Sequence, residues 1–545
     1  MADYDIVVIG SGAGGLAAAV ALAQSGLKVA VFEQHYVPGG WCHSFQLGGY
    51  RFSPGVHYIG KLEEGARMRR IFEGLGVSGD IEFCELNPDG YDHIQVGSRR
   101  FDVPKGRERF AERLKAEFPR EKSGIDAYLR TVEKMGAELD SLEEFAGIKA
   151  LALPFKAPSL LRWGLRSAES LINAHAQNPM LRAILAAQSG DHGLPPSLAP
   201  APVHAAVTNH YFDGAYYPRG GGFAIPRAFV RALKRAGGEL FLKTPIDRLL
   251  LEGRRVVGVR LADGREVRAK HVVSNADPHA TFAKLIGLDR LSGRLRRKLS
   301  RTRYSVSALS LFFAADFEAG ELGLDSGNLW RYAHPDLEKI YSQGREPWRL
   351  EERGGVPGLF LTVTTLKDPS KFRRRHTMEA FTFIGRDAFR DWSASRCGGR
   401  PGAYADLKER LMDRMLEAVE EAVPGLRSRV VFRDLGTPLT NEHFVAATGG
   451  NLYGTEKTLG QVGPWAYQAQ SEFEGLWMCG ASTLSHGVMG AMLSGLDAAR
   501  RIVGGARIDD MLTQKGAPLR IYPSERPRDW PEDLQKLMGL DAVAR

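Results

Sequence analysis

An α/β fold with a Rossmann-type parallel sheet is predicted for this chain of 545 residues by three features. First, the β-branched run Asp5–Ile9 leads through a glycine-rich turn and a small-residue helix to a second strand at Val29–Phe32. Second, short strand patterns recur at 239–275 and after residue 305, between helical stretches. Third, glycine accounts for 62 residues, about 11% against an average near 7%, which favours tight turns or backbone-to-ligand contacts.

The overall composition is that of a globular protein. Hydrophobic residues make up 43% of the chain, enough for an ordinary core, so a mainly disordered chain is excluded. The formal net charge of +9 suits an anionic cofactor, an anionic membrane surface or nucleic acid. Because no recognition module accompanies the basic runs at 294–303 and 371–375, nucleic acid is not an expected partner.

Cysteine spacing and hydropathy bear on the compartment. Cys42, Cys84, Cys397 and Cys479 are far apart, so neither a zinc site nor a disulfide framework is expected, and no other metal-ligand spacing occurs. The longest strongly apolar run, 308–315, is far shorter than the ~18 residues of a membrane-spanning helix. Only Met1 to Tyr4 precede the first strand, which predicts no signal peptide and a cytoplasmic protein.

The glycine-rich turn has the pattern of a dinucleotide-binding site. Gly10, Gly12 and Gly15 stand between a strand and a helix, and Glu33 ends the next strand 18 residues after Gly15. Gly10 permits the tight turn, Gly12 lets the backbone approach a pyrophosphate, and Gly15 lets the helix pack on the strand. The helix N-terminus attracts phosphate and Glu33 can accept ribose hydroxyls. An empty glycine-rich turn is the alternative, and the complete set of residues argues against it.

The residues after Glu33 favour FAD over a nicotinamide cofactor. A plain nicotinamide dehydrogenase normally enters its second helix here. This chain instead continues with the loops 38–41, 48–52 and 53–60, which are rich in glycine. Such loops let the backbone run along an extended cofactor. No second motif of this kind opens a later β-α-β unit, so a dedicated nicotinamide domain is not expected.

The rest of the chain alternates between helical and strand patterns. Charged, helical sequence at 63–144 is followed by a segment at 151–196 that prolines break into short helices. Strands are predicted at 239–242, 256–261 and 271–274, with a hairpin turn at 262–265, and again at 305–314 and 358–364. An amphipathic helix is predicted at 407–423. The charged, proline-containing segment after Gly505 shows no obvious contribution to a core.

Several motifs together resemble the phytoene desaturase-like flavoproteins, which include carotenoid desaturases, carotenoid isomerases and retinol saturases. The matching segments are 7–16, Glu33 with 38–40, 53–60, 217–222, 272–277 and 479–495. They span nearly all of residues 4–505. Trp41-Cys-His43 and the loop 55–60 look more like the saturase branch than the desaturase branch.

The resemblance implies a discontinuous FAD-binding domain with an inserted α+β substrate-binding domain. The FAD-binding domain would consist of residues 1–75, 214–285 and 436–505, where much of the glycine excess lies. The substrate-binding domain would consist of residues 76–213 and 286–435, and residues 506–545 would form a C-terminal tail.

The resemblance also implies which residues contact FAD, one group at a time. Gly10, Gly12, Ala13 and Gly15 would meet the pyrophosphate, Glu33 the adenosine ribose, Ile246 the adenine, and Gly40, Trp41, Val488 and Met489 the flavin side. The further residues expected to bind the cofactor are Gly14, Gln34, Gly55, Val56 and Gly480. The helix after His486 would direct its N-terminus at the isoalloxazine carbonyl. One departure is Gly480-Ala481, where many such flavoproteins have Gly-Asp. Ser482 or Thr483 is the candidate replacement for the missing side-chain contact.

Three residues are candidates for the chemistry. His57 lies in a loop expected beside the flavin, and histidine is the usual acid–base residue of enzymes, so it is the best acid–base candidate. A histidine bonded to neighbouring backbone is the alternative. His486 would either stabilise reduced flavin or cap the following helix. Tyr217 lies in a similar loop and is the third candidate; the alternative is that its side chain only packs against its neighbours.

The resulting hypothesis is an FAD-dependent oxidoreductase that reduces carbon–carbon double bonds of a long apolar polyene or isoprenoid lipid, such as a retinoid or carotenoid. NAD(P)H is a candidate external electron donor. A carotenoid or phytoene desaturase or a cis-trans isomerase is the alternative within the class. A non-catalytic prenyl- or lipid-binding protein is the alternative of another class. The sequence leaves the substrate, the reaction direction and the oligomeric state open.

A segment of basic amphipathic character raises the further hypothesis of peripheral membrane association. Apolar residues at 160–161, 165, 168 and 171–172 would share one face of a single helix, with Arg162 and Arg166 on the other. Such a helix suits a membrane surface from which a lipophilic substrate is taken up. A helix that covers the protein's own core is the alternative.

Overall fold

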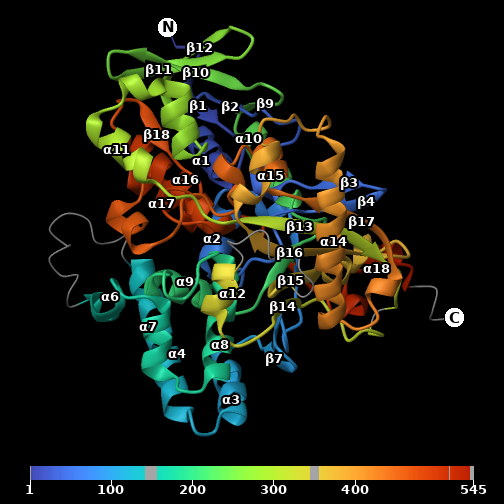
Figure 1. Ribbon diagram of the computed structural model, residues 1–545. Helices are drawn as coiled ribbons and strands as arrows, with labels where there is room; N and C mark the ends of the chain where they lie inside the picture. The colour runs from blue at the N-terminus through green and yellow to red at the C-terminus, as the bar shows by residue number, and fades with distance from the viewer. Residues whose placement is uncertain are drawn as a thin grey trace.

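A parallel sheet extended by hairpin strands forms one end of the molecule, near the N-terminus in Figure 1. The computed structural model describes residues 2–141, 156–318, 320–343, 351, 355–514 and 516–540. The seven strands of the sheet are β1 (Tyr4–Ile9), β2 (Val29–Phe32), β9 (Glu239–Phe241), β10 (Ile246–Glu252), β11 (Arg255–Leu261), β12 (Glu266–Ser274) and β18 (Leu476–Met478). Their order is β10-β11-β12-β1-β2-β9, with β18 also paired to β12. β1 runs parallel to both β2 and β12.

Small residues allow two helices to pack closely beside this sheet. α1 (Ala13–Gln24) is buried from Gly14 to Ala23 and packs against α16 (Gly487–Val503). A Cβ atom at Gly495 would lie 2.1 Å from the carbonyl oxygen of Gly14. A Cβ atom at Gly15 would lie 2.2 Å from the carbonyl oxygen of Gly10. Any larger side chain at these positions would force the helices and the turn apart.

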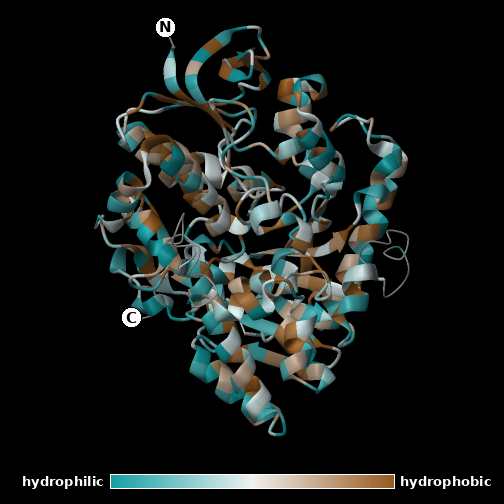
Figure 2. Ribbon diagram, turned by 90° about the vertical axis from the view of Figure 1, so that its left-hand side faces the viewer, coloured by the Kyte–Doolittle hydropathy of each residue, from teal (hydrophilic) through white to brown (hydrophobic). Residues whose placement is uncertain are grey.

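A second sheet of seven strands forms the centre of the rest of the molecule. Its strands are β6 (Asp92–Val96), β7 (Arg99–Val103), β13 (Ser307–Ala315), β14 (Asn328–Tyr332), β15 (Gly358–Val363), β16 (His376–Ile384) and β17 (Val430–Gly436). α14 (Gly402–Ala422) packs into the core on one face. The other face packs on α3 (Arg107–Glu117), α4 (Lys122–Ser141), α7 (Ala168–His175), α8 (Pro179–Ala186) and α9 (Ala201–Tyr211). Figure 2 shows hydrophilic and hydrophobic residues alternating along the peripheral helices.

The predicted strands and the predicted long helix largely have counterparts in the structure. β13, β15 and α14 lie where strands at 305–314 and 358–364 and a helix at 407–423 were expected. The expectation of one continuous amphipathic helix at 160–172 is wrong. The chain forms α6 (Pro158–Trp163), breaks, and starts α7 with Ser167, whose Oγ accepts the backbone N–H of Ser170 at 3.2 Å. This N-cap gives the second helix its own direction.

The expectation that the chain after Gly505 adds nothing to a core is also wrong. α17 (Gly505–Thr513) buries Ile508 completely. β19 (Arg520–Pro523) joins β5 (Glu82–Glu85) and β8 (Tyr216–Pro218) in a three-stranded sheet. Trp530 is 2% exposed and packs near Cys84. The charged sequence hides this contribution because the partners lie more than four hundred residues earlier in the chain.

Within the ranges described above, no helix is both long and apolar enough to cross a membrane.

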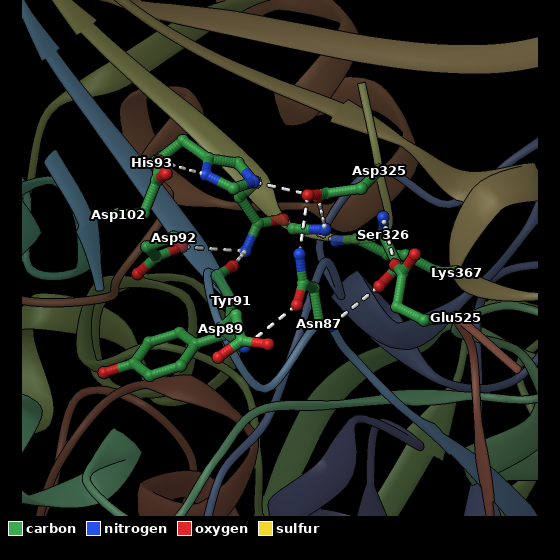
Figure 3. Close-up of polar contacts among 12 residues, drawn as sticks. Asn87, Asp89, Tyr91, Asp92, His93, Asp102, Asp325, Ser326, Lys367 and Glu525 are labelled. Atoms are coloured by element: carbon green, nitrogen blue, oxygen red, sulfur yellow. Dashed lines mark hydrogen bonds and ion pairs between the residues drawn. The ribbon is translucent and has the colours of Figure 1, made fainter. Parts of the chain in front are cut away.

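A buried histidine ties the edge of the second sheet to a neighbouring loop (Figure 3). Nδ1 of His93 lies 2.6 Å from Oδ1 of Asp102, and its Nε2 lies 2.8 Å from Oδ1 of Asp325. Burial opposes a charge on the ring, but the two carboxylates prevail and raise the pKa of His93. The same contacts overcome burial at Asp102 and Asp325 and lower the pKa of both carboxyl groups. The imidazolium therefore links β6, β7 and the loop before β14.

We expect His93→Gln to lower the free energy of unfolding by about 2 kcal/mol, since two hydrogen bonds between charged groups are lost. Because the pKa of His93 is raised in the folded protein, the stability that its charge adds is fully present below the pKa of the unfolded chain, about 6.5. This stability is lost as the pH rises through the pKa of the folded protein. The lowered pKa values of Asp102 and Asp325 mean that their carboxylates stabilise the folded protein above about pH 4. This stability is lost as the pH falls through their pKa values in the folded protein. Urea unfolding should thus show the largest deficit between about pH 4 and 6.5. His443→Gln, at an exposed site on α15 (Pro438–Val445), is the control; a deficit that does not vary with pH would contradict the charged assignment.

Candidate functional site

One large cavity, of about 1370 Å³, lies against the carboxyl ends of β1 and β2. This position, outside the carboxyl ends of parallel strands, is where α/β sheets bind ligands. The N-terminal turns of α1 and α16 line one side, and α6, α9 and the phenylalanines Phe360 and Phe381 of the second sheet line another. A pocket for one small molecule has roughly 300–1,000 Å³, so this cavity has room for two ligands.

The glycine-rich turn forms an anion site at one end of the cavity. Gly10 has a positive φ of 85°, and Gly10, Gly12, Ala13 and Gly14 line the wall where α1 begins. The N–H groups of the first helical turn and the helix dipole favour a phosphate there. The side chain of Asn275 braces this turn, because its Oδ1 accepts the N–H of Gly15 at 3.0 Å. Gly15 itself does not line the cavity; it provides the close packing described above.

Glu33 lies in the cavity wall at the end of β2, as a residue that binds ribose hydroxyls would. Glu33 is 8% exposed, and its carboxylate accepts the N–H and hydroxyl of Ser11, at 2.8 and 2.6 Å, and the N–H of His35 at 2.9 Å. Gln34 and Ile246 line the cavity nearby, where the ribose and adenine are expected. Because these three hydrogen bonds fix the position of the carboxylate, it can accept a hydrogen bond from a ligand hydroxyl in a defined direction.

The other residues expected to bind the cofactor, those on the flavin side among them, come together from three parts of the chain. Gly40, Trp41, Gly55, Gly480, Val488 and Met489 all line the cavity. Val56 does not; it is 2% exposed and packs against Gly222. Gly480 has a φ of 93° and donates its N–H to Ser494 Oγ at 2.7 Å.

The two candidate replacements for the missing acid after Gly480 differ in their surroundings. Ser482 lines the cavity. Thr483 does not, and its hydroxyl donates to the carbonyl oxygen of Gly480 at 2.9 Å. Of the two, Ser482 is therefore the one in a position to contact a cofactor.

Two of the three candidates for chemistry line the cavity. His57 places Nε2 3.0 Å from Oε2 of Glu379 on β16, and its ring packs on Phe360. His486 occupies the N-cap position of α16 without a capping side-chain bond. It donates Nε2–H to the carbonyl oxygen of Asp191 at 2.9 Å, and burial lowers its pKa to about 3. His486 is thus neutral near pH 7 and acts as a hydrogen-bonding group without a charge.

Tyr217, the third candidate, needs correction because it does not line the cavity. Its side chain lies on β8, 2% exposed, and the ammonium group of Lys367 sits 5.4 Å from its ring centre. Burial raises the pKa of its hydroxyl far above the ordinary value. The alternative of a packing residue fits this position.

Sequence reasoning missed a group of buried ionisable residues beside the cavity. Tyr58 joins Asp92 of β6 to Asp191. Lys367 donates to the carbonyl oxygen of His57 at 2.6 Å, and Lys457 donates to that of Ala481. Burial lowers the pKa of each lysine to about 7. Tyr58 belongs to the motif at 53–60, where a packing role was the favoured expectation. No local pattern marks the aspartates and lysines, since each meets its partners only in the folded chain.

Comparisons with known proteins agree with this geometry. A family model described as flavin containing amine oxidoreductase matches residues 13–503. The all-trans-retinol 13,14-reductase of Danio rerio is 31% identical over 91% of this chain and 85% of that protein, and the chloroplastic prolycopene isomerase of Arabidopsis thaliana is 28% identical over 92% and 82%. The crystal structure of an oxidoreductase from Methanosarcina mazei has the same fold, with a TM-score of 0.61 at 16% identity over 90% of this chain and 98% of that one. The predicted α/β fold and flavoprotein resemblance are thus confirmed: the chain belongs to the flavin containing amine oxidoreductase family and is an FAD-dependent oxidoreductase.

Proposed function

We propose that this protein saturates a carbon–carbon double bond of a long, apolar polyene lipid. The observation that carries the proposal is the composition of the cavity described above, which joins a phosphate-binding turn to a region lined by aliphatic and aromatic side chains. A cofactor and a lipid can therefore meet inside it. The similarity to an all-trans-retinol 13,14-reductase, at 31% identity over most of both chains, supports a retinoid- or carotenoid-like substrate.

The residues present fit FAD along the sheet side of the cavity. Gly12, Ala13 and Gly14 would hold the pyrophosphate, Glu33 the ribose, and the first turn of α16 the isoalloxazine. When bound, FAD supplies hydride transfer. All strands of the first sheet come from residues 4–32, 239–274 and 476–478, which supports the proposed FAD-binding segments 1–75, 214–285 and 436–505.

The remaining half of the cavity suits a lipid chain. It is lined by Leu160, Leu161, Val203, Val207, Tyr211 and Phe381. His57 lies between this region and the flavin-side loops, and Glu379 and Lys367 fix the orientation of its ring and its backbone. We assign His57 to positioning the bound lipid, since Glu379 holds its Nε2 and fixes the orientation of the ring.

Anaerobic half-reactions test the direction of the chemistry. The purified flavoprotein is reduced with dithionite, or with NADPH as the proposed physiological type of donor, and then mixed with all-trans-retinol or a carotenoid. Saturation predicts that the flavin is reoxidised while the lipid gains two hydrogen atoms, measured by mass spectrometry. Bleaching of oxidised flavin by a more saturated lipid would instead identify a desaturase. A changed double-bond geometry without net reduction would identify an isomerase, and a protein that binds lipid without any flavin would be a non-catalytic binder.

Membrane association is proposed from the exposed rim of the cavity. Leu161 and Leu165 both line the cavity and are 71% and 72% exposed, while Arg162 and Arg166 lie over the ring of Trp163. Apolar side chains beside arginines suit the surface of an anionic bilayer. Leu171 and Ile172, expected on the same face, are instead buried in the core.

We expect the double variant Leu161→Ser and Leu165→Ser to weaken binding to anionic phospholipid vesicles at least about tenfold, since each leucine contributes ~1.5–3 kcal/mol when buried. Vesicle co-sedimentation measures the effect. Leu537→Ser, at a site 62% exposed and outside the cavity lining, is the matched control. Equal sedimentation of the double variant and the wild type would exclude this rim as the docking surface.

A further inference from the structure

A tyrosine hydroxyl joins two carboxyl groups at the wall of the cavity. The Tyr58 hydroxyl lies 2.9 Å from Oδ2 of Asp191 and 3.3 Å from Oδ2 of Asp92. Tyr58 and Asp191 line the cavity, whereas Asp92 is completely buried behind them. A hydroxyl has a single proton and can donate it to only one of the two carboxyl groups. If both carboxyl groups were ionised, two negative charges would face each other across the same hydroxyl oxygen.

The two carboxyl groups differ in their hydrogen-bond donors. Asp92 accepts Nδ2–H of Asn328 at 2.9 Å and Nε2–H of Gln188 at 3.0 Å, and both bonds stabilise its ionised form. Asp191 has Tyr58 as the one partner of its carboxyl group among the residues that the structure describes. When two carboxyl groups share a site, the proton stays on the one with fewer donors. Burial and the charge of Asp92 accordingly raise the pKa of Asp191 to about 8, against about 6 for Asp92.

Backbone contacts hold Asp191 at the junction of the two halves of the cavity. Asp191 ends the short helix η5 (Ala187–Asp191), and its carbonyl oxygen accepts Nε2–H of His486, the residue that begins α16. The carbonyl oxygen of Gly190 accepts the hydroxyl of Tyr453 at 2.8 Å. On the other side, Tyr58 stacks on Tyr211 with ring centres 4.3 Å apart. The carboxyl group is therefore between the proposed flavin position and the apolar region for the lipid.

We propose that Asp191, placed beside Tyr58 in the cavity wall, is the acid that delivers a proton to the carbon–carbon double bond of the bound lipid. This role rests on the proposed function. One carbon of the double bond receives a hydride, whose two electrons come from the reduced cofactor and ultimately from an external two-electron donor. The π electron pair of that bond forms the new C–H bond at the other carbon as the O–H bond of Asp191 breaks. Asp191 is left as a carboxylate and regains a proton from water through the cavity.

The titratable groups around Asp191 leave it without a directly bonded cation. His486 is neutral near pH 7, and Lys367 faces Asp92, not Asp191. The charge of Lys457 contributes to the lowered pKa of His486, and its ammonium group donates to the carbonyl oxygen of Ala481. Six tyrosines complete the surroundings: Tyr58, Tyr91, Tyr211, Tyr332, Tyr341 and Tyr453. Burial raises the pKa of each of these tyrosine hydroxyls, so none is ionised near neutral pH. The charge that acts on the pKa of Asp191 is therefore that of Asp92.

The experiment compares wild type with Asp191→Asn, Asp191→Glu, Tyr58→Phe and the control Asp213→Asn, whose carboxyl group pairs with Lys61 outside the cavity lining. Flavin content, melting temperature and reduction by dithionite should be the same in all. Reoxidation by the polyene should slow at least about 100-fold in Asp191→Asn, recover partly in Asp191→Glu and be unchanged in the control. In heavy water the wild-type product should carry one deuterium at the protonated carbon.

The pH dependence separates a proton donor from a structural residue. The wild-type rate should fall as pH rises through about 8, where Asp191 loses its proton. Tyr58→Phe removes a bond that stabilises the carboxylate, so the fall should move to higher pH. An infrared carbonyl band of a protonated carboxyl group, measured without substrate, should titrate over the same range in wild type and be missing in Asp191→Asn.

Two failures remain distinguishable. If the wild type reduces polyenes and Asp191→Asn does so at the same rate and with the same pH profile, the proton-donor role of Asp191 is overturned while the proposed function stands. If the wild type transfers no hydrogen to any polyene, the proposed function fails and the donor role fails with it, whatever the infrared band shows. A folded Asp191→Glu with no recovery, together with an unshifted profile in Tyr58→Phe, also counts against the role.

Discussion

Gly12→Val should yield a folded protein that no longer binds FAD and is therefore inactive. Gly12 has a φ of −63°, which valine tolerates, so the backbone itself is not strained. A Cβ atom there would lie 2.5 Å from Nδ2 of Asn275, and the displaced amide could no longer accept the N–H of Gly15. The branched methyl groups would also occupy the cavity wall where a pyrophosphate meets the start of α1. Both effects act on the anion site and leave the core intact.

The measurement is the molar ratio of flavin to protein from visible absorbance after purification, alongside circular dichroism and thermal unfolding. Gly26→Ala is the control at the other end of α1. Its φ is 81° with no atom within 4 Å of an added Cβ, so it should cost about 1 kcal/mol of stability and keep its flavin. A Gly12→Val protein with full flavin content would show that close approach at this position is not needed.

Lys367→Met should produce the largest loss of stability among single substitutions near the site. The side chain of Lys367 is completely buried, and its ammonium group donates to the carbonyl oxygen of His57 and to Oδ1 of Asn328. Its charge faces Asp92 and Glu379. Removing one member of a buried charged group leaves the others uncompensated and costs about 3–5 kcal/mol. The loop that carries His57 would lose its anchor at the same time.

Denaturant unfolding of the holoenzyme measures the loss, and the binding of a polyene measures the effect on the loop. Lys371→Met is the matched control, because Lys371 is exposed and only four residues away. The control should change stability by less than about 0.5 kcal/mol. A Lys367→Met protein as stable as the control would mean that Asp92 and Glu379 are neutral in the folded protein.

Local sequence was sufficient for the cofactor half of the site. Gly10, Gly12 and Gly15 lie within six residues, and their spacing between a strand and a helix leaves few alternatives to the observed turn. Glu33 follows because a β-α-β unit has a nearly constant length. The helix after His486 was implied by the family resemblance, and α16 occupies that position. Of the residues expected to contact FAD, all but Gly15 and Val56 line the cavity.

The long-range features could not be read from local patterns. The segment at 160–172 has a continuous helical pattern, yet Ser167 starts a separate helix whose apolar residues pack into a core. β19 looks like part of a charged tail, and its pairing with β5 depends on strands at the other end of the chain. A helical or strand pattern reports which faces are apolar but not what covers them.

The amino-acid sequence alone therefore determined the fold class, the flavin and the phosphate-binding turn, because these depend on residues a few positions apart whose conformations are restricted by glycine and by helix geometry. Only the tertiary structure brought together the ionisable residues beside them. Tyr58, Asp92 and Asp191 are 34 to 133 residues apart, and the protonation of each depends on burial and on the charges it meets. Those quantities arise only when the two sheets close around a common cavity, so no local pattern in the sequence marks Asp92 or Asp191.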